Sequence, residues 1–377
     1  MRIRKSYLSG KIKIPPSKSH THRALLFASL ASGPCTIKNA LESPDIETMR
    51  RALCELKKDH PLIDSGNSGI VYRFLAGLAA TTSKRVRITG DQSIKERRPI
   101  QPLLNAVNSL GGTALPGVEI SGPLRPGKVK ICGKDSQPVS ALLIACAISK
   151  GPFEIEVVDA QEREWLDVTL GWFDFLEIPY EREGYKRFFL PGSTTIKPFN
   201  YTVPADFSSA AFPIAASIVT KSQISIEGLD FSDSQGDKKL FDYVKMNQEF
   251  SGGEIDVGPF VDALPILATL ACYAKKPTRL FNGAICRQKE SDRIHAIAQE
   301  LRKMGAIIEE KSDGLLIQPA KLKGANLKSH HDHRIAMALA VAAMGASGET
   351  TIEGFTVHQK TYPTFCEDFK KLGANLE

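Results

Sequence analysis

The sequence predicts an α/β protein of two domains, each built from three copies of one helix-and-strand unit. Six apolar segments rich in Ala and Leu have the length of helices and lack a polar face, which is typical of helices buried in a core. A short break and then a β-rich run follow each of them. The six segments start 49 to 72 residues apart, a spacing that indicates a repeated supersecondary unit. The starts are at positions 19, 68, 136, 208, 262 and 332.

The six apolar helices are each expected to be followed by a strand. In chain order the pairs are 19–32 with 35–37, 74–80 with 85–89, 141–148 with 153–158, 210–219 with 223–226, 263–274 with 279–281, and 335–344 with 350–352.

A second, amphipathic helix is expected after each strand. The clearest example starts at Ser291, carries Ile294, Ile297 and Leu301 on one face, and stops at Gly305. Hairpin-like runs follow such helices, so the unit is β-α-β-α-β-β.

Two of the units are short, with starts only 49 and 54 residues before the next. A hairpin is therefore expected to be missing at 56–67 and at 244–253. Three units per domain place the first domain at 16–205 and the second at 206–377. Residues 1–15 complete the second domain, and the chain crosses between domains near 15–18 and 204–206.

Composition excludes several classes of function. The chain has 377 residues, 42% of them hydrophobic, so it can bury large cores. Its net charge of +7 comes from dispersed Lys and Arg, which fits small anionic partners and gives no basic tail for nucleic acid. No apolar run approaches the roughly 18 residues that span a membrane, and the start has no apolar signal core. The seven scattered cysteines form no C-x-x-C pair. We therefore expect a cytoplasmic protein with reduced thiols and no membrane partner.

The first helix start carries an unusual charge. Pro15 and Pro16 hold the chain extended, and Ser19 is one candidate N-cap. Lys18 and Arg23 lie in the same stretch, although the positive end of a helix dipole disfavours cations. An anionic ligand would satisfy the N–H groups and both cations together. A basic helix start in plain solvent is the alternative.

Cations recur at or beside the other helix starts. They are Arg73, Lys95, Arg97, Arg98, Arg287, Lys289, Arg293, His333, Arg334 and Lys360. For any one of these cations, the alternative is a solvated surface charge. Their recurrence at equivalent points of a repeat instead favours an electropositive cleft, where the helix N-termini of the two domains face each other. Arginine suits a bidentate grip on phosphate or carboxylate, and lysine suits a point charge beside a leaving group.

Two carboxylates lie among these cations. Asp262 opens a buried helix, and Glu290 lies inside a basic cluster. Both are candidates for acid–base chemistry. The alternatives are a simple N-cap for Asp262, and for Glu290 an ion pair with Lys289 or Arg293.

No metal or nucleotide cofactor is expected. The run 330–333 contains three histidines, but consecutive side chains at a helix start diverge, and no i, i+4 histidine pair accompanies them. A Walker loop and a G-x-G-x-x-G fingerprint are both absent from the sequence.

Together these motifs resemble, in content and order, the 5-enolpyruvylshikimate-3-phosphate synthase family of enolpyruvyl transferases. The matching motifs are Lys18-Ser19-x-x-x-Arg23, Gly66-Asn67-x-Gly69, Arg98-Pro99, Ser136-Gln137, Asp262, Lys289-Glu290-x-Asp292-Arg293, Asp332-His333-Arg334 and Lys360-Thr361. Single motifs are weak, but the ordered set is specific and spans nearly the whole chain. The resemblance implies a two-domain inside-out α/β barrel around buried parallel helices.

The resemblance also implies an activity. Members transfer the enolpyruvyl group of phosphoenolpyruvate to the 5-hydroxyl of shikimate 3-phosphate and release phosphate, a step of chorismate and aromatic amino-acid biosynthesis that needs no metal or organic cofactor. By resemblance, shikimate 3-phosphate is held by Lys18, Ser19, Arg23, Ser136, Gln137, Asp262 and Lys289. Phosphoenolpyruvate is held by Lys18, Gly69, Arg98, Gln137, Arg293, Arg334 and Lys360. Asn67 and His333 are secondary candidates for the site as a whole.

Three residues would carry the chemistry, by the same resemblance. Asp262 would take the proton of the attacking hydroxyl, and Glu290 would protonate the methylene carbon. Lys18 would stabilise or protonate the departing phosphate after a tetrahedral intermediate.

The chain departs from the family pattern where phosphate would bind. Asp135 stands where serine is common, Glu162 aligns near another phosphate-contacting serine, and Trp165 aligns near a usual Tyr or His. The acids would repel a substrate phosphate unless they point away or pair with Arg163. Phe74 also stands where proline is frequent.

Two alternatives remain open at the level of sequence. An enolpyruvyl transferase for a nucleotide sugar shares the fold but carries a reactive cysteine on a mobile loop, where Cys35, Cys54 and Cys286 do not sit. A non-catalytic relative that binds anions or RNA ends would not need Asp262 and Glu290 among its cations. We expect an enzyme that acts as a monomer on small anions.

Overall fold

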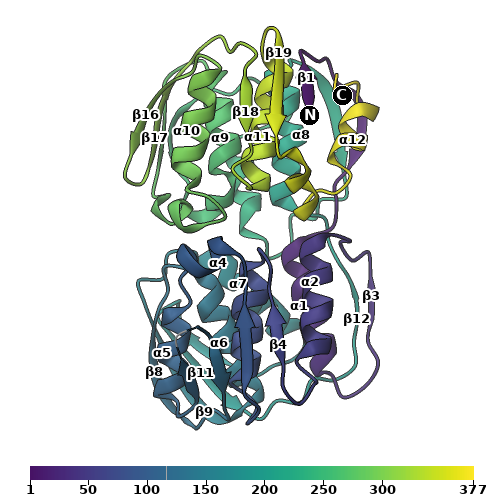
Figure 1. Cartoon of the computed structure of the whole chain (residues 1–377). Coiled ribbons are helices and arrows are strands. Elements are labelled where there is room, and N and C mark those ends of the chain that lie inside the picture. Colours follow the sequence, from purple (N-terminus) through teal and green to yellow (C-terminus); the bar gives the residue numbers. More distant parts are fainter. Residues whose placement is uncertain (116) are drawn as a thin grey trace. The chain divides into compact units, whose positions relative to one another are not determined.

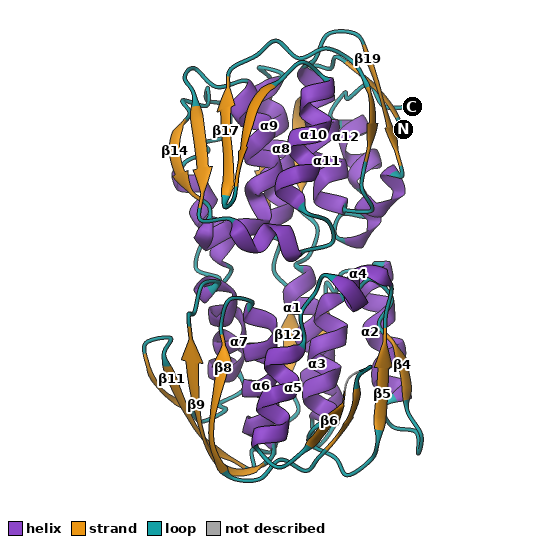
Figure 2. Cartoon of the chain, turned by 60° about the vertical axis from the view of Figure 1, so that its left-hand side comes forward, coloured by secondary structure: helices purple, strands orange, loops and turns teal. Residues whose placement is uncertain are grey.

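The chain divides into two compact units in the computed structural model, which describes residues 1–115 and 117–377. The N-terminal unit is Lys18–Val203, and the C-terminal unit combines Met1–Ser17 with Pro204–Glu377. In each unit the helices gather inside and the strands lie along the outer sides (Figures 1 and 2). The predicted inside-out α/β class is therefore confirmed.

The N-terminal unit contains α1 to α7 and β3 to β12. Its helices are α1 (Lys18–Leu30), α2 (Pro44–Glu55), α3 (Gly69–Ala79), α4 (Gln92–Glu96), α5 (Gln101–Ser109), α6 (Ser136–Ile148) and α7 (Arg163–Phe175). Its strands are β3 (Thr36–Lys38), β4 (Leu62–Asp64), β5 (Val86–Thr89), β6 (Thr113–Leu115), β7 (Glu119–Ser121), β8 (Gly127–Cys132), β9 (Lys150–Val158), β10 (Glu181–Glu183), β11 (Arg187–Gly192) and β12 (Asn200–Thr202).

The C-terminal unit contains the remaining elements, including four 3₁₀ segments labelled η. Its helical segments are α8 (Phe207–Val219), η1 (Gly236–Asp242), η2 (Gly258–Ala263), α9 (Leu264–Cys272), η3 (Ala284–Gln288), α10 (Arg293–Lys303), α11 (His333–Gly345), η4 (Phe355–Lys360) and α12 (Phe365–Lys371). Its strands are β1 (Arg2–Arg4), β2 (Ser9–Lys13), β13 (Gln223–Glu227), β14 (Gly253–Asp256), β15 (Thr278–Phe281), β16 (Ile307–Lys311), β17 (Gly314–Gln318), β18 (Asn326–Lys328) and β19 (Glu349–Glu353).

The apolar helices form the centre of each unit because they have no polar face to present to water. Every residue of α3 and α9 is buried. In the N-terminal unit α3 packs on α6, and a Cβ added to Gly77 would lie only 2.7 Å from the carbonyl oxygen of Ala141. In the C-terminal unit α11 packs against both α8 and α9. Close packing of this kind aligns the N-terminal turns that carry the candidate residues.

The sheets show which units are complete. Three four-stranded sheets each combine a parallel pair with an antiparallel hairpin, in the orders β4-β5-β7-β6, β8-β9-β11-β10 and β14-β15-β17-β16. In the part of the chain that the structure describes, the α1 and α8 units form two-stranded parallel sheets, β12 with β3 and β13 with β2, and no hairpin is added to either. The two predicted missing hairpins are thus confirmed.

The two chain crossings lie side by side in the C-terminal unit. The N–H of Ser17 donates to the carbonyl of Pro204 at 2.8 Å, and the N–H of Asp206 donates to that of Pro15 at 2.9 Å. The units part directly after Ser17 and before Pro204.

One predicted element is wrong. The amphipathic helix expected after 223–226 is only the 3₁₀ segment η1, because its sequence GDKKLFD offers no second apolar turn. Within the described residues, no helix is long and apolar enough to cross a bilayer.

Candidate functional site

Lys18 belongs to a partly buried group at the first turn of α1. Its Nζ lies 3.3 Å from Oδ2 of Asp45, and Nε2 of His22 lies 3.3 Å from the same oxygen. Asp45 is placed in the first turn of α2, where the helix dipole favours a carboxylate. Burial lowers the pKa of His22 more than its contact with Asp45 raises it, so the neutral ring donates its Nε2–H to Asp45. The ammonium of Lys18 is thus held by Asp45 while its side chain stays 17% exposed.

Arg23 is buried among neutral groups. Its Nε and Nη2 donate to Oγ1 of Thr169 at 3.0 and 2.7 Å, and Nη1 donates to the carbonyl of Ser19 at 3.1 Å. The ring of Phe74 lies 5.1 Å from its guanidinium carbon. Burial lowers the pKa of Arg23 to about 9, because these groups replace water without supplying a negative charge. A buried cation in such surroundings gains from an added anion.

Gly69 lies in a cradle of side chains at the start of α3. A Cβ on Gly69 would lie 2.7 Å from Nη1 of Arg98, 2.8 Å from Nη1 of Arg73 and 3.3 Å from Oε1 of Gln137. A larger residue at this position would displace these side chains. Arg73 donates to Oε1 of Gln137 at 3.0 Å, and Arg98 donates to the carbonyl of Asn67 at 3.2 Å. The structure therefore brings together four predicted site residues from three sequence motifs near Arg73: Asn67, Gly69, Arg98 and Gln137.

Two carboxylates cap the first turn of α6. Asp135 is the N-cap and accepts the N–H of Gln137 at 2.9 Å. Glu162 is 2% exposed, and its Oε2 accepts both the N–H of Ser136 at 2.9 Å and its hydroxyl at 3.0 Å. The donors at this helix end are therefore already engaged.

The expected pairing of these acids with Arg163 is not what holds Asp135. Oδ2 of Asp135 lies 2.9 Å from Nη2 of Arg73. The exposed side chain of Arg163 donates instead to the carbonyl of Ala160 at 2.9 Å. Arg73 is closer because α3 and α6 pack directly against each other.

Three carboxylates surround Arg293 at the start of α10. Nη1 donates to Asp262 at 2.7 Å, Nη2 to Glu290 at 2.8 Å and Nε to Asp332 at 2.8 Å. The side chain of Arg293 is 1% exposed. Burial alone would lower the pKa of Arg293, but Asp332, Glu290 and Asp262 together raise it well above its usual value. Arg293 is thus a permanent cation that fixes both predicted acid–base carboxylates.

Two further cations share these carboxylates. Nη2 of Arg334 lies 2.9 Å from Oδ2 of Asp262, and Nζ of Lys360 lies 3.0 Å from Oε1 of Glu290. The Nε of Arg334 is buried and has no hydrogen-bond partner in the described parts of the chain. Burial alone would raise the pKa of Asp262, but Arg334 and Arg293 outweigh it and hold that pKa well below its usual range. Asp262 is therefore ionised at neutral pH.

The N-cap explanation for Asp262 is wrong. Asp262 lies in η2, one residue before the N-cap of α9, and that N-cap, Ala263, makes no side-chain bond. The local chain is bent at Phe260, whose φ of −145° interrupts the helical path. The carboxylate of Asp262 contacts Arg293 and Arg334 and does not cap its own helix.

The other candidates lie at or beside helix ends. Lys289 ends η3, and its charge helps to lower the pKa of Asp262. His333 is the first residue of α11 and is buried. The side chain of Asn67 donates to Asp91 at 2.6 Å and to Ser93 at 3.1 Å, so it braces the turn into α4.

Sequence reasoning missed three members of these groups. Asp45 follows Ser43 and a proline, a helix-start signal that was available. Thr169 lies within the amphipathic helix α7, where nothing in the pattern marks it. Asp332 was taken only as part of a motif, although its carboxylate binds Arg293.

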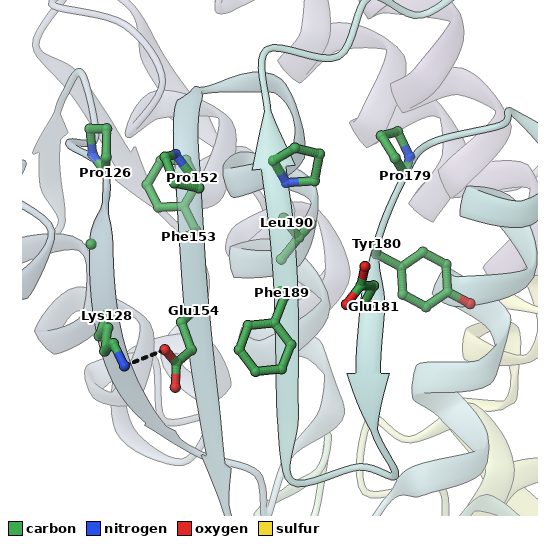
Figure 3. Close-up of a pocket in the computed structure, with 12 residues that line it drawn as sticks. Pro126, Lys128, Pro152, Phe153, Glu154, Pro179, Tyr180, Glu181, Phe189 and Leu190 are labelled. Atoms are coloured by element: carbon green, nitrogen blue, oxygen red, sulfur yellow. Dashed lines mark ion pairs between the residues drawn. The ribbon is translucent and has the colours of Figure 1, made fainter.

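A hollow of about 790 Å³ lies on the sheet β8-β9-β11-β10, apart from the candidate residues (Figure 3). Pro126, Pro152 and Phe189 line it, together with the ion pair of Lys128 and Glu154 at 2.6 Å. No candidate residue lines this hollow.

The fold and these groups define a class of protein: an α/β enzyme with buried cations and ionised carboxylates at its helix N-termini, suited to acid–base chemistry on anions. The model of the family EPSP synthase (3-phosphoshikimate 1-carboxyvinyltransferase) matches residues 3–64 and 57–369. The chain therefore belongs to the EPSP synthase family.

Individual relatives agree. Proteins named 3-phosphoshikimate 1-carboxyvinyltransferase from Chlamydia felis and Chlamydia caviae are 43% and 42% identical, over 100% of this chain and 94% of theirs. A solved structure of EPSP synthase from Acinetobacter baumannii superposes with a TM-score of 0.80 at 24% identity, covering 100% of this chain and 98% of that one. A second one from that organism gives 0.79 at 23% identity, covering 100% and 99%. These two structures support the fold alone.

Proposed function

We propose that the chain transfers the enolpyruvyl group of phosphoenolpyruvate to the 5-hydroxyl of shikimate 3-phosphate and releases phosphate, as a step of chorismate biosynthesis. Membership of the EPSP synthase family supports this reaction. The observation that carries it is the pairing of Asp262 and Glu290 with Arg293, Arg334 and Lys360. Acids and anion-binding cations are thereby coupled in one network.

We assign the two substrates to groups of residues. Shikimate 3-phosphate is held by Lys18, Ser19, Arg23, Ser136, Gln137, Asp262 and Lys289. Phosphoenolpyruvate is held by Lys18, Gly69, Arg98, Gln137, Arg293, Arg334 and Lys360. The cradle around Gly69 and the buried, unpartnered Nε of Arg334 support the second group.

The network explains how an ionised Asp262 becomes a base. In the free protein its pKa is held well below the usual range by Arg334 and Arg293, which makes it a weak proton acceptor. A substrate anion that binds Arg334 withdraws that stabilisation, so the pKa of Asp262 rises toward a value useful for catalysis. Binding therefore activates the base.

The reaction then follows in two steps. The 5-hydroxyl attacks C2 of phosphoenolpyruvate, its proton goes to Asp262, and Glu290, in its protonated form, donates a proton to C3. The resulting ketal phosphate has one new C–O bond and a methyl group. In the second step a methyl proton returns to Glu290, which restores the double bond as the bond to phosphate breaks. The departing phosphate takes the proton from Asp262 and is stabilised by Lys18, so both carboxyl groups return to their starting forms.

A phosphate-release assay tests the proposal. The purified chain is mixed with phosphoenolpyruvate and one of three acceptors: shikimate 3-phosphate, a nucleotide sugar, or none. Release only with shikimate 3-phosphate supports the proposal. Release only with the nucleotide sugar would replace the acceptor, and no release with either would favour a binding protein.

We also propose that the enzyme acts as a monomer in the cytoplasm, on small anions and without a nucleic acid or membrane partner. Free cysteines at all seven positions are compatible with a reducing compartment. Light scattering of the purified chain should give a single species of about 41.2 kDa.

A further inference from the structure

The donors that the proposed function offers to the phosphate of shikimate 3-phosphate are already used inside the protein. Both the N–H and the hydroxyl of Ser136 donate to Oε2 of Glu162, at 2.9 and 3.0 Å. A phosphate oxygen needs these same two donors. One carboxylate therefore occupies the position that an anionic ligand would take.

Glu162 is held in this position. It directly precedes α7, its carbonyl accepts the N–H of Trp165 at 3.2 Å, and its side chain is 2% exposed. Because α6 and α7 pack together, the carboxylate lies against the first turn of α6. Arg73 forms an ion pair with Asp135 at 2.9 Å, and the charge of Glu162 also helps to raise the pKa of Arg73, which burial lowers.

Asp135 differs from Glu162 because an equivalent aspartate recurs in the fold. Asp206 and Asp332 are N-caps of α8 and α11, and each accepts the N–H two residues ahead, as Asp135 does. Asp135 is therefore the structural cap of the repeated unit. Glu162 is an additional charge.

Next to this turn lies a buried cation, Arg23, whose hydrogen-bond partners among the described residues carry no negative charge. Ser140, one helical turn after Ser136, accepts the hydroxyl of Thr169 at 2.9 Å, and Thr169 in turn accepts two N–H groups of Arg23. Arg23 is 4% exposed, and within the described residues its hydrogen bonds go to the neutral oxygen atoms of Thr169 and Ser19. This independent feature favours an anion near α6, which Glu162 opposes.

We propose that Glu162 is an acceptor-specificity residue that competes with the phosphate of shikimate 3-phosphate for Ser136. The proposal rests on the proposed function, which supplies the acceptor. To bind its phosphate at α6, the protein must release Glu162 from Ser136 and overcome the repulsion between the two anions. The wild-type protein therefore prefers shikimate 3-phosphate over unphosphorylated shikimate by an unusually small ratio.

Two substitutions test this competition. Glu162→Gln keeps the shape and one acceptor oxygen but removes the charge. Glu162→Ser has a side chain too short to contact Ser136. Glu164→Gln, two residues away in the first turn of α7, is the matched control for the loss of one charge. Calorimetry measures binding of shikimate 3-phosphate and of shikimate to each protein, and thermal unfolding checks that each is folded.

We expect both Glu162 variants to bind shikimate 3-phosphate about tenfold more tightly, the effect of one competing charge-assisted bond. Shikimate binding should change less than about twofold, and the control should match the wild type. Unchanged or weaker binding of shikimate 3-phosphate in a folded variant would overturn the proposal, and so would an equal gain for both ligands. The phosphate-release assay on the wild-type protein tests the proposed reaction separately, because the calorimetric binding measurements do not depend on turnover.

Discussion

Arg293 in the C-terminal unit and Arg23 in the N-terminal unit are both buried guanidinium groups, but their surroundings are opposite. Arg293 contacts three carboxylates within 2.8 Å, and they raise its pKa. Arg23 contacts the hydroxyl of Thr169 and a carbonyl, and burial lowers its pKa to about 9. Lys18, with one carboxylate at 3.3 Å, is intermediate.

The difference separates two uses of a buried cation. Arg293 is neutralised by the protein itself, so its main role is to hold Asp262 and Glu290 in place. Arg23 has its desolvation cost offset only in part, so an anionic ligand would complete its site. The three cations should therefore respond differently to the same substitution.

The largest effect is expected from Arg293→Met. Removing this cation leaves the buried Asp332 and Glu290 and the partly buried Asp262 without their shared partner, which should lower the free energy of unfolding by about 3–5 kcal/mol. Urea denaturation measures this. Arg279→Met is the control, because the side chain of Arg279 is 56% exposed and its ion pair with Glu254, at 3.3 Å, lies on the surface. A loss below about 1 kcal/mol for Arg293→Met would show that the carboxylates do not depend on it.

Lys18→Met should abolish turnover while leaving the fold intact. The ammonium beside the departing phosphate is lost, and we expect kcat to fall at least about 1,000-fold, equal to ~4 kcal/mol of transition-state stabilisation. The unfolding midpoint should change little, because Asp45 keeps its contact with Nε2 of His22 at 3.3 Å when the partly exposed Lys18 is replaced. Lys11→Met, at a 75% exposed lysine, is the matched control for kcat. Near-normal turnover in Lys18→Met would refute its role.

Arg23→Met should separate binding from stability. Because the wild-type guanidinium has neutral partners, its removal should cost less than about 1.5 kcal/mol of unfolding free energy. Binding of shikimate 3-phosphate should weaken about 100-fold, or ~2.7 kcal/mol. Calorimetry and urea denaturation of the same samples check both values. A stability loss as large as that of Arg293→Met would remove the contrast between the two arginines.

The smallest expected effect is the pH dependence of stability caused by His22, whose Nε2 lies 3.3 Å from Asp45. Burial lowers its pKa from 6.5, so below about pH 6.5 the unfolded chain takes up a proton that the folded protein does not. Stability should therefore fall as the pH drops from 6.5 toward 5, by up to ~1.4 kcal/mol per pH unit. His22→Gln should flatten this slope. Burial also lowers the pKa of His358, but that residue is present in both proteins and cancels in the comparison. Equal slopes would show that His22 does not titrate in this way.

Much of the fold could be predicted because its signal is local and repeated. Apolar runs without a polar face marked the central helices, as in α9, which is buried throughout. The short spacings marked the two missing hairpins, since the number of residues between Glu55 and Leu62 leaves no room for one. The segment η1 was wrongly predicted as an amphipathic helix because the repeated unit was extended to it, although its own sequence, GDKKLFD, offers no second apolar turn.

The candidate residues could be named, but their partners could not. Arg293 binds Asp332, 39 positions away, and Arg23 binds Thr169, 146 positions away. Asp262 looked like a helix cap because the cap pattern is local, and the local pattern did not show the bend at Phe260.

By itself, the sequence determined the repeated unit, the buried helices and the set of charged residues at their starts, because periodicity and helix-end chemistry depend on neighbours along the chain. Only the tertiary structure decided which charges meet: three carboxylates at Arg293, none among the hydrogen-bond partners of Arg23, and Glu162 on the donors of Ser136. The energy of a buried charge depends on what lies within a few ångströms of it, and those neighbours are brought together by packing from distant parts of the chain.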